Sequence, residues 1–197
     1  ITIPPSLTKI VGSPFLGCSS LTSISIPPSV TEIGRNAFSR CSSLTGITIP
    51  ETVTEIGSSA FYGCSSLTSI TIPESVTEIG SSAFDGCSSL TSISIPPSVT
   101  EIGEWAFAVC ESLTSISVSK DNKVYDSRED CNAIIHTESN TLIQGCKNTI
   151  IPPSVTVIGE KAFLVCSSLT SITIPPSEME VGHTAVNGCS SLAGIPI

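Results

Sequence analysis

The sequence predicts a solenoid, a chain wound through successive turns of similar shape. Cysteine, phenylalanine and an I-x-I element each recur at 23-residue intervals, with one longer interval in the C-terminal half. A repeat of about 20 to 29 residues built on L-x-x-L-x-L is typical of leucine-rich repeats. We therefore expect a leucine-rich-repeat solenoid of the α/β type, a right-handed superhelix of mostly short parallel β-strands joined by short helical or 3-10 turns. The recurring positions are Cys18, Cys41, Cys64, Cys87, Cys110, Cys166 and Cys189; Phe15, Phe38, Phe61, Phe84, Phe107 and Phe163; and Ile3, Ile26, Ile49, Ile72, Ile95, Ile151, Ile174 and Ile197.

The periodicity also predicts the domain organisation. Residues 1–197 form one solenoid, with regular repeats over 1–118 and 151–197 and an irregular unit over 119–150. Repeat proteins are stacks in which each unit contacts only its neighbours, so no second domain is needed. Both ends of the sequence lie inside a repeat, and we expect the chain to be a fragment of a longer protein.

Composition excludes several classes of protein. Charged residues make up 13% of the chain, where about 25% is usual, so the chain is not a disordered tail. Its net charge of −9 argues against a nucleic-acid partner, which needs clustered lysine and arginine. No run of about 18 apolar residues suggests a membrane span in this segment.

The first half of each repeat has the pattern of a strand. In Leu67–Ile72 the apolar Ile70 and Ile72 alternate with Thr71, which is typical of a half-buried strand. Pro73 should end it, because proline cannot donate a hydrogen bond to the ladder. We expect these I-x-I strands to stack in parallel as one continuous sheet.

The second half of the repeat should contain a second extended run followed by a turn. Val76–Ile79 is expected to be a second short extended run. Gly80 then suits a backbone position with positive φ. Ser81–Phe84 is long enough for only one helical or 3-10 turn, which should direct Phe84 into the core.

The residues of the repeat resemble a known family. The run IPxSVTxIGxxAFxxCSSLTSI is similar to the BspA-like leucine-rich repeats, also called the Treponema pallidum type, and the similarity covers essentially the whole chain. The resemblance implies a surface or secreted protein of bacteria or protists, often an adhesin that binds host matrix proteins or other cells. It supplies no catalytic motif.

The irregular unit is the main departure from the repeat. Between Val118 and Ile151 the chain takes 33 residues, and residues 133–135 and 141–143 flank a polar tip in the pattern of a β-hairpin. Insertions in solenoids project from one face and often carry recognition. Tyr125 and Arg128 are therefore candidate contact residues, although the unit could also be an elaboration without a partner.

Cysteines and histidines give no clear metal site. Seven of the nine cysteines share the core register, where we expect reduced, buried thiols. Cys131 and Cys146 bracket the hairpin and could form a disulfide. Zinc is not expected, because no C-x-x-C occurs and only His136 and His183 are present.

Two surface patterns repeat along the chain. Glutamates share one outward register and could bind a cation, or could simply be solvated side chains that keep the solenoid soluble. Threonine and serine form two files that could bind a protein, a glycan or even ice, or could reflect strand propensity alone. The glutamates are Glu32, Glu55, Glu78, Glu101 and Glu180, and the candidate hydroxyl residues are Thr45, Thr48, Thr68, Thr71, Thr91, Ser94, Thr114 and Ser117.

No enzyme motif is present. The chain has no G-x-S-x-G, P-loop or dinucleotide-binding glycine motif, so neither catalytic residues nor a cofactor is expected. We expect a non-enzymatic binding or adhesion scaffold at the cell surface or outside the cell, with a protein or glycan ligand on host or neighbouring cells. The alternative is a structural spacer.

Overall fold

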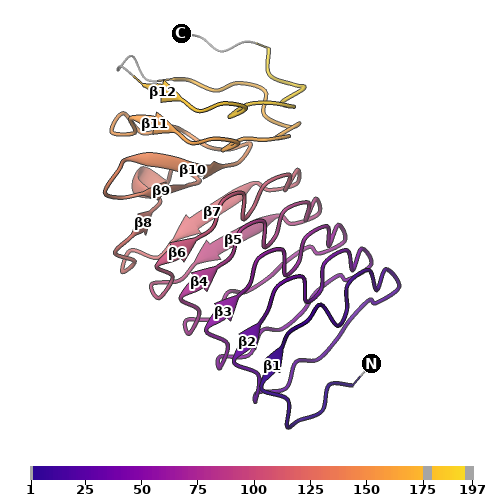
Figure 1. Cartoon of the computed structure of the whole chain (residues 1–197). Helices are drawn as coiled ribbons and strands as arrows, with labels where there is room; N and C mark the ends of the chain where they lie inside the picture. Colours follow the sequence, from indigo (N-terminus) through magenta and orange to yellow (C-terminus); the bar gives the residue numbers. More distant parts are fainter. Residues whose placement is uncertain (1, 175–178, 194–197) are drawn as a thin grey trace.

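The chain forms a solenoid of stacked rungs, as the periodicity predicts. The computed structural model describes residues 2–174 and 179–193, and Figure 1 shows the rungs following one another from the N-terminal to the C-terminal end. The β8–β10 segment separates two sets of regular rungs. Pro175 and Ile197, which the periodicity assigns to a strand stop and an I-x-I place, lie outside the described residues. Among the described residues, no helix has the length and hydropathy needed to cross a membrane.

The strands are short and form three sheets. The first has the order β1-β2-β3-β4-β6 and is parallel throughout, the second has the order β12-β11-β10-β9-β8, and the third pairs β5 with β7. In the first sheet each strand contributes only two residues. The strands are β1 (Lys9–Ile10), β2 (Glu32–Ile33), β3 (Glu55–Ile56), β4 (Glu78–Ile79), β5 (Ser92–Ile95), β6 (Glu101–Ile102), β7 (Ser115–Val118), β8 (Tyr125–Asp126), β9 (Ala133–His136), β10 (Thr141–Gly145), β11 (Val157–Ile158) and β12 (Glu180–Val181).

The continuous sheet is not where the sequence predicted it. Among the described residues, the I-x-I elements pair as strands only in β5 and β7, with one isolated bridge from Ser25 to Thr48, whereas the Val-Thr-Glu-Ile run carries the long ladder. On the I-x-I side the inter-rung bond from the Thr68 amide to the Thr45 carbonyl is 3.3 Å long. On the other side, the Gly80 amide donates to the Ile56 carbonyl at 2.7 Å. The I-x-I rungs are therefore held together less tightly.

The repeated glycine has a different role from the one predicted. Gly80 does not have a positive φ, so that prediction was wrong for it and for its equivalents. A Cβ on Gly80 would lie 2.4 Å from the Ser58 nitrogen of the preceding rung, a distance that real Cβ atoms essentially never show. Glycine is required here because the backbones of successive rungs touch. The equivalent positions are Gly34, Gly57, Gly103, Gly159 and Gly182.

The segment after the glycine is not helical, which corrects a second prediction. Ser82 has a φ of +54°, a left-handed conformation that ends any helical turn at once. Hydrogen bonds from the Ala83 amide to the Gly80 carbonyl (3.2 Å) and from Asp85 to Ser82 (3.2 Å) instead form successive turns. Among the described residues, the only 3-10 segment is Arg128–Asp130, in the irregular unit.

The predicted inward position of the phenylalanine rings is confirmed, and the rings also stack over five rungs. Phe15, Phe38, Phe61, Phe84 and Phe107 stack with centroid separations of 5.1 to 5.4 Å and nearly parallel planes. The rings from Phe38 onward are fully buried. Aromatic pairs of this kind add about 0.5–1.5 kcal/mol each beyond the burial of apolar area.

The cysteines of the repeat line the same core. The Cys64 thiol donates to the Phe38 carbonyl at 3.1 Å, and Cys41, Cys87, Cys110 and Cys189 make the equivalent bond. All nine cysteines are free thiols in the structure. The predicted burial is thus confirmed for the repeat, except at the half-buried Cys18, whereas the reduced state in solution stays a prediction.

The predicted hairpin of the irregular unit is also confirmed. β9 and β10 pair in antiparallel fashion, and β10 continues the ladder by pairing in parallel with β11. The Gly145 amide donates to the Ala162 carbonyl at 2.8 Å, the bond that a phenylalanine makes in a regular rung. A Cβ on Gly145 would lie 2.2 Å from the Phe163 ring, so this ring fills the space where a side chain would be. The ring stack is therefore interrupted after Phe107.

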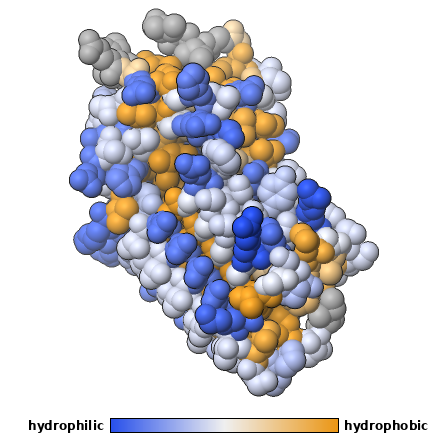
Figure 2. Space-filling model, in the orientation of Figure 1, coloured by the Kyte–Doolittle hydropathy of each residue, from blue (hydrophilic) through white to orange (hydrophobic). Residues whose placement is uncertain are grey.

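The surface of the solenoid is mixed in character. Figure 2 shows hydrophilic residues recurring along the length of the molecule, with hydrophobic residues between them. Three of the large exposed hydrophobic residues, Leu7, Val11 and Leu16, belong to the first rung. Elsewhere in the described part of the chain such residues stand singly, as is common on protein surfaces.

We predict that Phe61→Ala lowers the free energy of unfolding by about 3–5 kcal/mol, because it removes a fully buried ring between two others. Urea denaturation measures this value. The control is Glu74→Ala, which truncates an exposed side chain and should change stability by less than about 0.5 kcal/mol. A loss below about 1 kcal/mol for Phe61→Ala would contradict an inward ring.

The buried thiols predict a loss of stability at alkaline pH. Burial, with a smaller contribution from Cys41, raises the pKa of Cys64 from 9.0 to about 12. The stabilisation from this protonated thiol is complete below the unfolded-state pKa near 9 and decreases as the pH rises toward 12, by about 1.4 kcal/mol per pH unit. The stability difference between the native chain and Cys64→Ala should therefore shrink between pH 9 and pH 11, as measured by denaturation. A difference that stays constant over this range would contradict the prediction.

Candidate functional site

The strongest candidate surface lies on the outer side of the I-x-I elements. In β5 and β7, Ile93 and Ile116 face the core, while the serines that alternate with them are exposed. The strands are in register, so equivalent serines lie side by side. We call this surface the hydroxyl face; it consists of Ser69, Thr71, Ser92, Ser94, Ser115 and Ser117, which line a shallow hollow of about 750 Å³.

The two predicted hydroxyl files differ in what their side chains do. In the first file, the Thr68 hydroxyl donates to the Thr45 carbonyl at 3.3 Å, and the Thr91 hydroxyl donates to the Thr68 carbonyl at the same distance. Thr45 and Thr114 make the equivalent bonds. These hydroxyl protons are used to join successive rungs, so this file reinforces the fold rather than offering donors to a ligand.

The second predicted file is available for binding. Thr48, Thr71, Ser94 and Ser117 are exposed, and their hydroxyls make no hydrogen bond with other residues in the described part of the chain. Each can therefore both donate and accept a hydrogen bond with a ligand. Thr71, Ser94 and Ser117 belong to the hydroxyl face, and Thr48 extends it by one rung toward the N-terminus.

Sequence reasoning missed a third file and one apolar residue. Ser69, Ser92 and Ser115 stand two residues before the second file, and this spacing places them on the same side of a strand. Ile150 occupies the position of Thr71 in its own unit and is 74% exposed. Its place directly before Ile151 and Pro152 was the available signal, because a hydroxyl residue stands there in the regular repeats.

A second hollow joins the hydroxyl face to the irregular unit. It has a volume of about 560 Å³ and shares Ser115, Ser117 and Ser119 with the first hollow. Its far wall includes Lys120 and Arg128. We call this part the insert hollow. The insert hollow is also lined by Asp126, Glu129 and Asp130, so the end of this polar surface near the irregular unit carries charges of both signs.

Arg128 is held firmly at the border of the insert hollow. Its guanidinium donates to both carboxylate oxygens of Asp126, at 2.8 and 2.6 Å, and to Asn140 at 2.8 Å. Burial alone would raise the pKa of Asp126, but hydrogen bonds from Arg128 and Thr137 outweigh it, and the pKa is lowered. Arg128 thus fixes the irregular unit and presents only part of its guanidinium to solvent.

Tyr125, predicted as a contact residue, lies inside the protein and lines neither hollow. It is 6% exposed, and its hydroxyl accepts a hydrogen bond from the Ile102 amide at 2.9 Å. Its ring packs edge-on against His136, with a centroid separation of 5.8 Å. Because β6 is the last strand of the first sheet in the described part of the chain, the tyrosine hydroxyl satisfies an amide that would otherwise lack a partner. Burial raises the pKa of Tyr125.

The glutamate register has the predicted alignment but no metal-binding geometry. Glu32, Glu55, Glu78 and Glu101 face one another on successive strands, and Lys9 at the start of the row pairs with Glu32 at 2.6 Å. Partial burial, followed by repulsion from Glu55 and Glu101, raises the pKa of Glu78. No group of three or more His, Cys, Asp or Glu side chains in residues 2–174 and 179–193 is arranged to hold a metal ion.

Several solved structures are similar to this chain. A leucine-rich cell surface protein of Faecalibacterium prausnitzii is 33% identical, with a TM-score of 0.77 over 100% of this chain and 60% of its own. A leucine-rich repeat protein of Bacteroides ovatus is 32% identical (TM-score 0.62, 99% of this chain and 62% of its own). The leucine-rich repeat protein of T. pallidum is 29% identical (TM-score 0.63, 94% and 72%). This chain therefore spans only about three fifths of the first two proteins.

The family comparison agrees with the fold. A comparison with curated protein sequences finds no match. The family described as the BspA type leucine-rich repeat region matches in 6 copies, over residues 1–114, 31–137 and 140–197. The matched segments include both the regular rungs and most of the irregular unit. The chain therefore belongs to the BspA type leucine-rich repeat family.

Proposed function

We propose that this chain is a non-enzymatic binding scaffold of a cell-surface or secreted protein, and that it binds a protein on host matrix or on other cells. The observation that carries the proposal is the hydroxyl face, because its exposed hydroxyls make no hydrogen bond within the described part of the chain. The adhesion role itself draws support from the family, since the F. prausnitzii relative is named a cell surface protein.

The rigidity of the rungs favours binding. The serines of β5 and β7 are held by parallel pairing and by isoleucines that are at most 3% exposed. A ligand therefore meets hydroxyls that are already in place, and little conformational entropy is lost when they form hydrogen bonds. Serine and threonine hydroxyls adapt to both donors and acceptors, so the same face suits the polar surface of a partner protein.

The two ends of the surface add specificity. At the irregular unit, Arg128 borders the insert hollow, and its guanidinium keeps one N–H without a partner among the described residues. Ile150, in the same unit, offers an exposed apolar side chain. Glu51 and Glu74 border the opposite end of the first hollow. A partner with a basic group opposite Glu51 and Glu74, and with groups of both signs opposite the insert hollow, would be complementary to this arrangement.

Two alternatives to a protein-binding scaffold are tested by the same substitutions and ligands. A ligand with its own repeat, such as a glycan or ice, could match hydroxyls that recur from rung to rung. A structural spacer would make no use of the hydroxyl face at all. Substitutions on this face separate a spacer from a binder, and the panel of ligands separates a protein partner from a glycan or ice.

We predict that the triple variant Thr48→Ala, Thr71→Ala, Ser94→Ala lowers affinity for a protein ligand by roughly tenfold or more, because three exposed hydrogen-bonding groups are lost. Binding should be measured by biolayer interferometry against immobilised matrix proteins, glycans and cell-surface extracts. Folding of the variant should be unchanged, since these hydroxyls have no partner among the described residues.

The matched control is Ser58→Ala with Ser81→Ala, which removes hydroxyls from the other side of the rungs and should leave affinity unchanged. Saturable binding that the triple variant weakens supports the proposal. Saturable binding that the triple variant leaves intact would exclude the hydroxyl face as the binding surface. No binding to any ligand of the panel would favour the spacer.

A further inference from the structure

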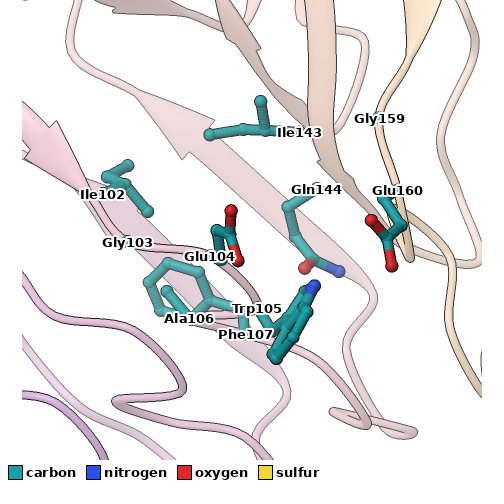
Figure 3. Close-up of a pocket in the computed structure, with 10 residues that line it drawn as sticks. All are labelled: Ile102, Gly103, Glu104, Trp105, Ala106, Phe107, Ile143, Gln144, Gly159 and Glu160. Carbon is teal, nitrogen blue, oxygen red and sulfur yellow. The ribbon is translucent and has the colours of Figure 1, made fainter. Parts of the chain in front are cut away.

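The irregular unit leaves a notch in the side of the solenoid. After the rung of Gly103–Phe107, the chain supplies no further G-x-x-A-F turn until residues 159–163. The extended strand β10 forms the intervening rung, and Gly145 occupies the position that phenylalanine has in a regular rung. The missing turn leaves a cavity of about 240 Å³ between the two rungs, and Figure 3 shows the side chains that surround it.

The walls of the notch combine apolar and acidic groups. Ile102, Phe107 and Ile143 provide an apolar lining. Glu104 comes from one side and Glu160 from the other; both are exposed, and neither forms an ion pair within the described part of the chain. The notch therefore offers two unneutralised carboxylates beside a surface that could accommodate an alkyl chain.

Gln144 aims a buried polar group into the same notch. It is only 9% exposed, and its amide nitrogen donates to the carbonyls of Gly145 at 2.8 Å and Ala162 at 3.3 Å. These two bonds fix the amide, and its Oε1 accepts no hydrogen bond from the described residues. In Figure 3 the amide points into the space between Glu104, Trp105 and Glu160. This oxygen is not fully buried, so it can accept a hydrogen bond from water or from a ligand in the notch.

Trp105 at the rim is unusual in its size for this position of the repeat and in its contacts. It is the only tryptophan of the chain, it is 38% exposed, and its φ is +59°. The equivalent positions hold small or polar residues such as Ser82 and Asn36, so a bulky residue here is strained. The Lys161 ammonium already lies 3.5 Å from the centre of the indole ring. One face of the indole ring is therefore covered by a cation of the chain itself, and a second cation must replace Lys161 or use the other face.

We propose that this notch binds an arginine side chain of a partner protein. The inference rests on the proposed binding function but assigns a second site, separate from the hydroxyl face. A guanidinium has five donors in a plane, which suits two carboxylates and one amide oxygen, and it stacks on indole. The methylene groups of the arginine would lie against Ile102 and Ile143. The net charge of −9 makes the chain complementary to a basic partner.

Because Trp105 is the only tryptophan, its fluorescence reports directly on the notch. The full chain should be titrated with N-acetyl-arginine amide, and with the citrulline amide as a neutral control of almost the same shape. We expect a saturable change with arginine at a Kd of about 1 mM, as a ligand of this size allows, and none with citrulline. The variant Glu104→Gln, Glu160→Gln should weaken binding at least fivefold.

The charge-matched control is Glu32→Gln with Glu55→Gln, which removes two carboxylates from the ladder and should leave the titration unchanged. No saturable change, an equal response to citrulline, or equal loss in both double variants would overturn the proposal. Equal affinity for the lysine amide would overturn the assignment to arginine. The absence of arginine binding at the notch would not contradict ligand binding by the hydroxyl face. The triple variant Thr48→Ala, Thr71→Ala, Ser94→Ala should bind N-acetyl-arginine amide as the native chain does.

Discussion

The structure depends on direct backbone contact between successive rungs at the repeated glycine. The Gly57, Gly80 and Gly103 amides donate to the isoleucine carbonyls one rung earlier at 2.7 Å, and no Cβ fits between the rungs there. This contact sets the same spacing at every turn. The phenylalanine rings stack 5.1 to 5.4 Å apart as a consequence, and the cysteine thiols reach the carbonyls of the neighbouring rung. The same spacing also aligns the serines of the hydroxyl face.

The irregular unit interrupts this contact once, with two consequences. β10 continues the ladder by pairing with β11, so the solenoid is not broken, but the missing turn stops the ring stack and opens the notch. Tyr125 and Arg128 then stabilise the junction through bonds to Ile102, Asp126 and Asn140. The two candidate binding surfaces therefore have different origins. The hydroxyl face comes from the regularity of the repeat, and the notch comes from its one interruption.

Periodicity in the sequence predicted the buried positions, but it carried no information on the distances between rungs. The burial of Phe61 and Cys64 was predictable from their recurrence, and the hairpin was predictable from the apolar runs around its polar tip. The role of Gly80 could not be predicted, because a positive φ and a close approach both select glycine. Thr68 and Thr71 also looked equivalent in the sequence, because both recur as hydroxyl residues in the repeat. The structure shows that the Thr68 hydroxyl donates a hydrogen bond to the preceding rung. The inward position of Tyr125 had no local signal.

The most direct test of rung-to-rung contact compares the free energies of unfolding of Gly80→Ala and Gly46→Ala. The added methyl group meets the backbone of Gly57 and Ser58 at 2.4 to 2.8 Å in the first variant, and nothing within 4 Å in the second. Rungs in backbone contact predict a loss of at least about 2 kcal/mol for Gly80→Ala. Gly46→Ala should be neutral or stabilise the chain by up to about 1 kcal/mol. Equal stability of the two variants would contradict the close contact on which the whole stack depends.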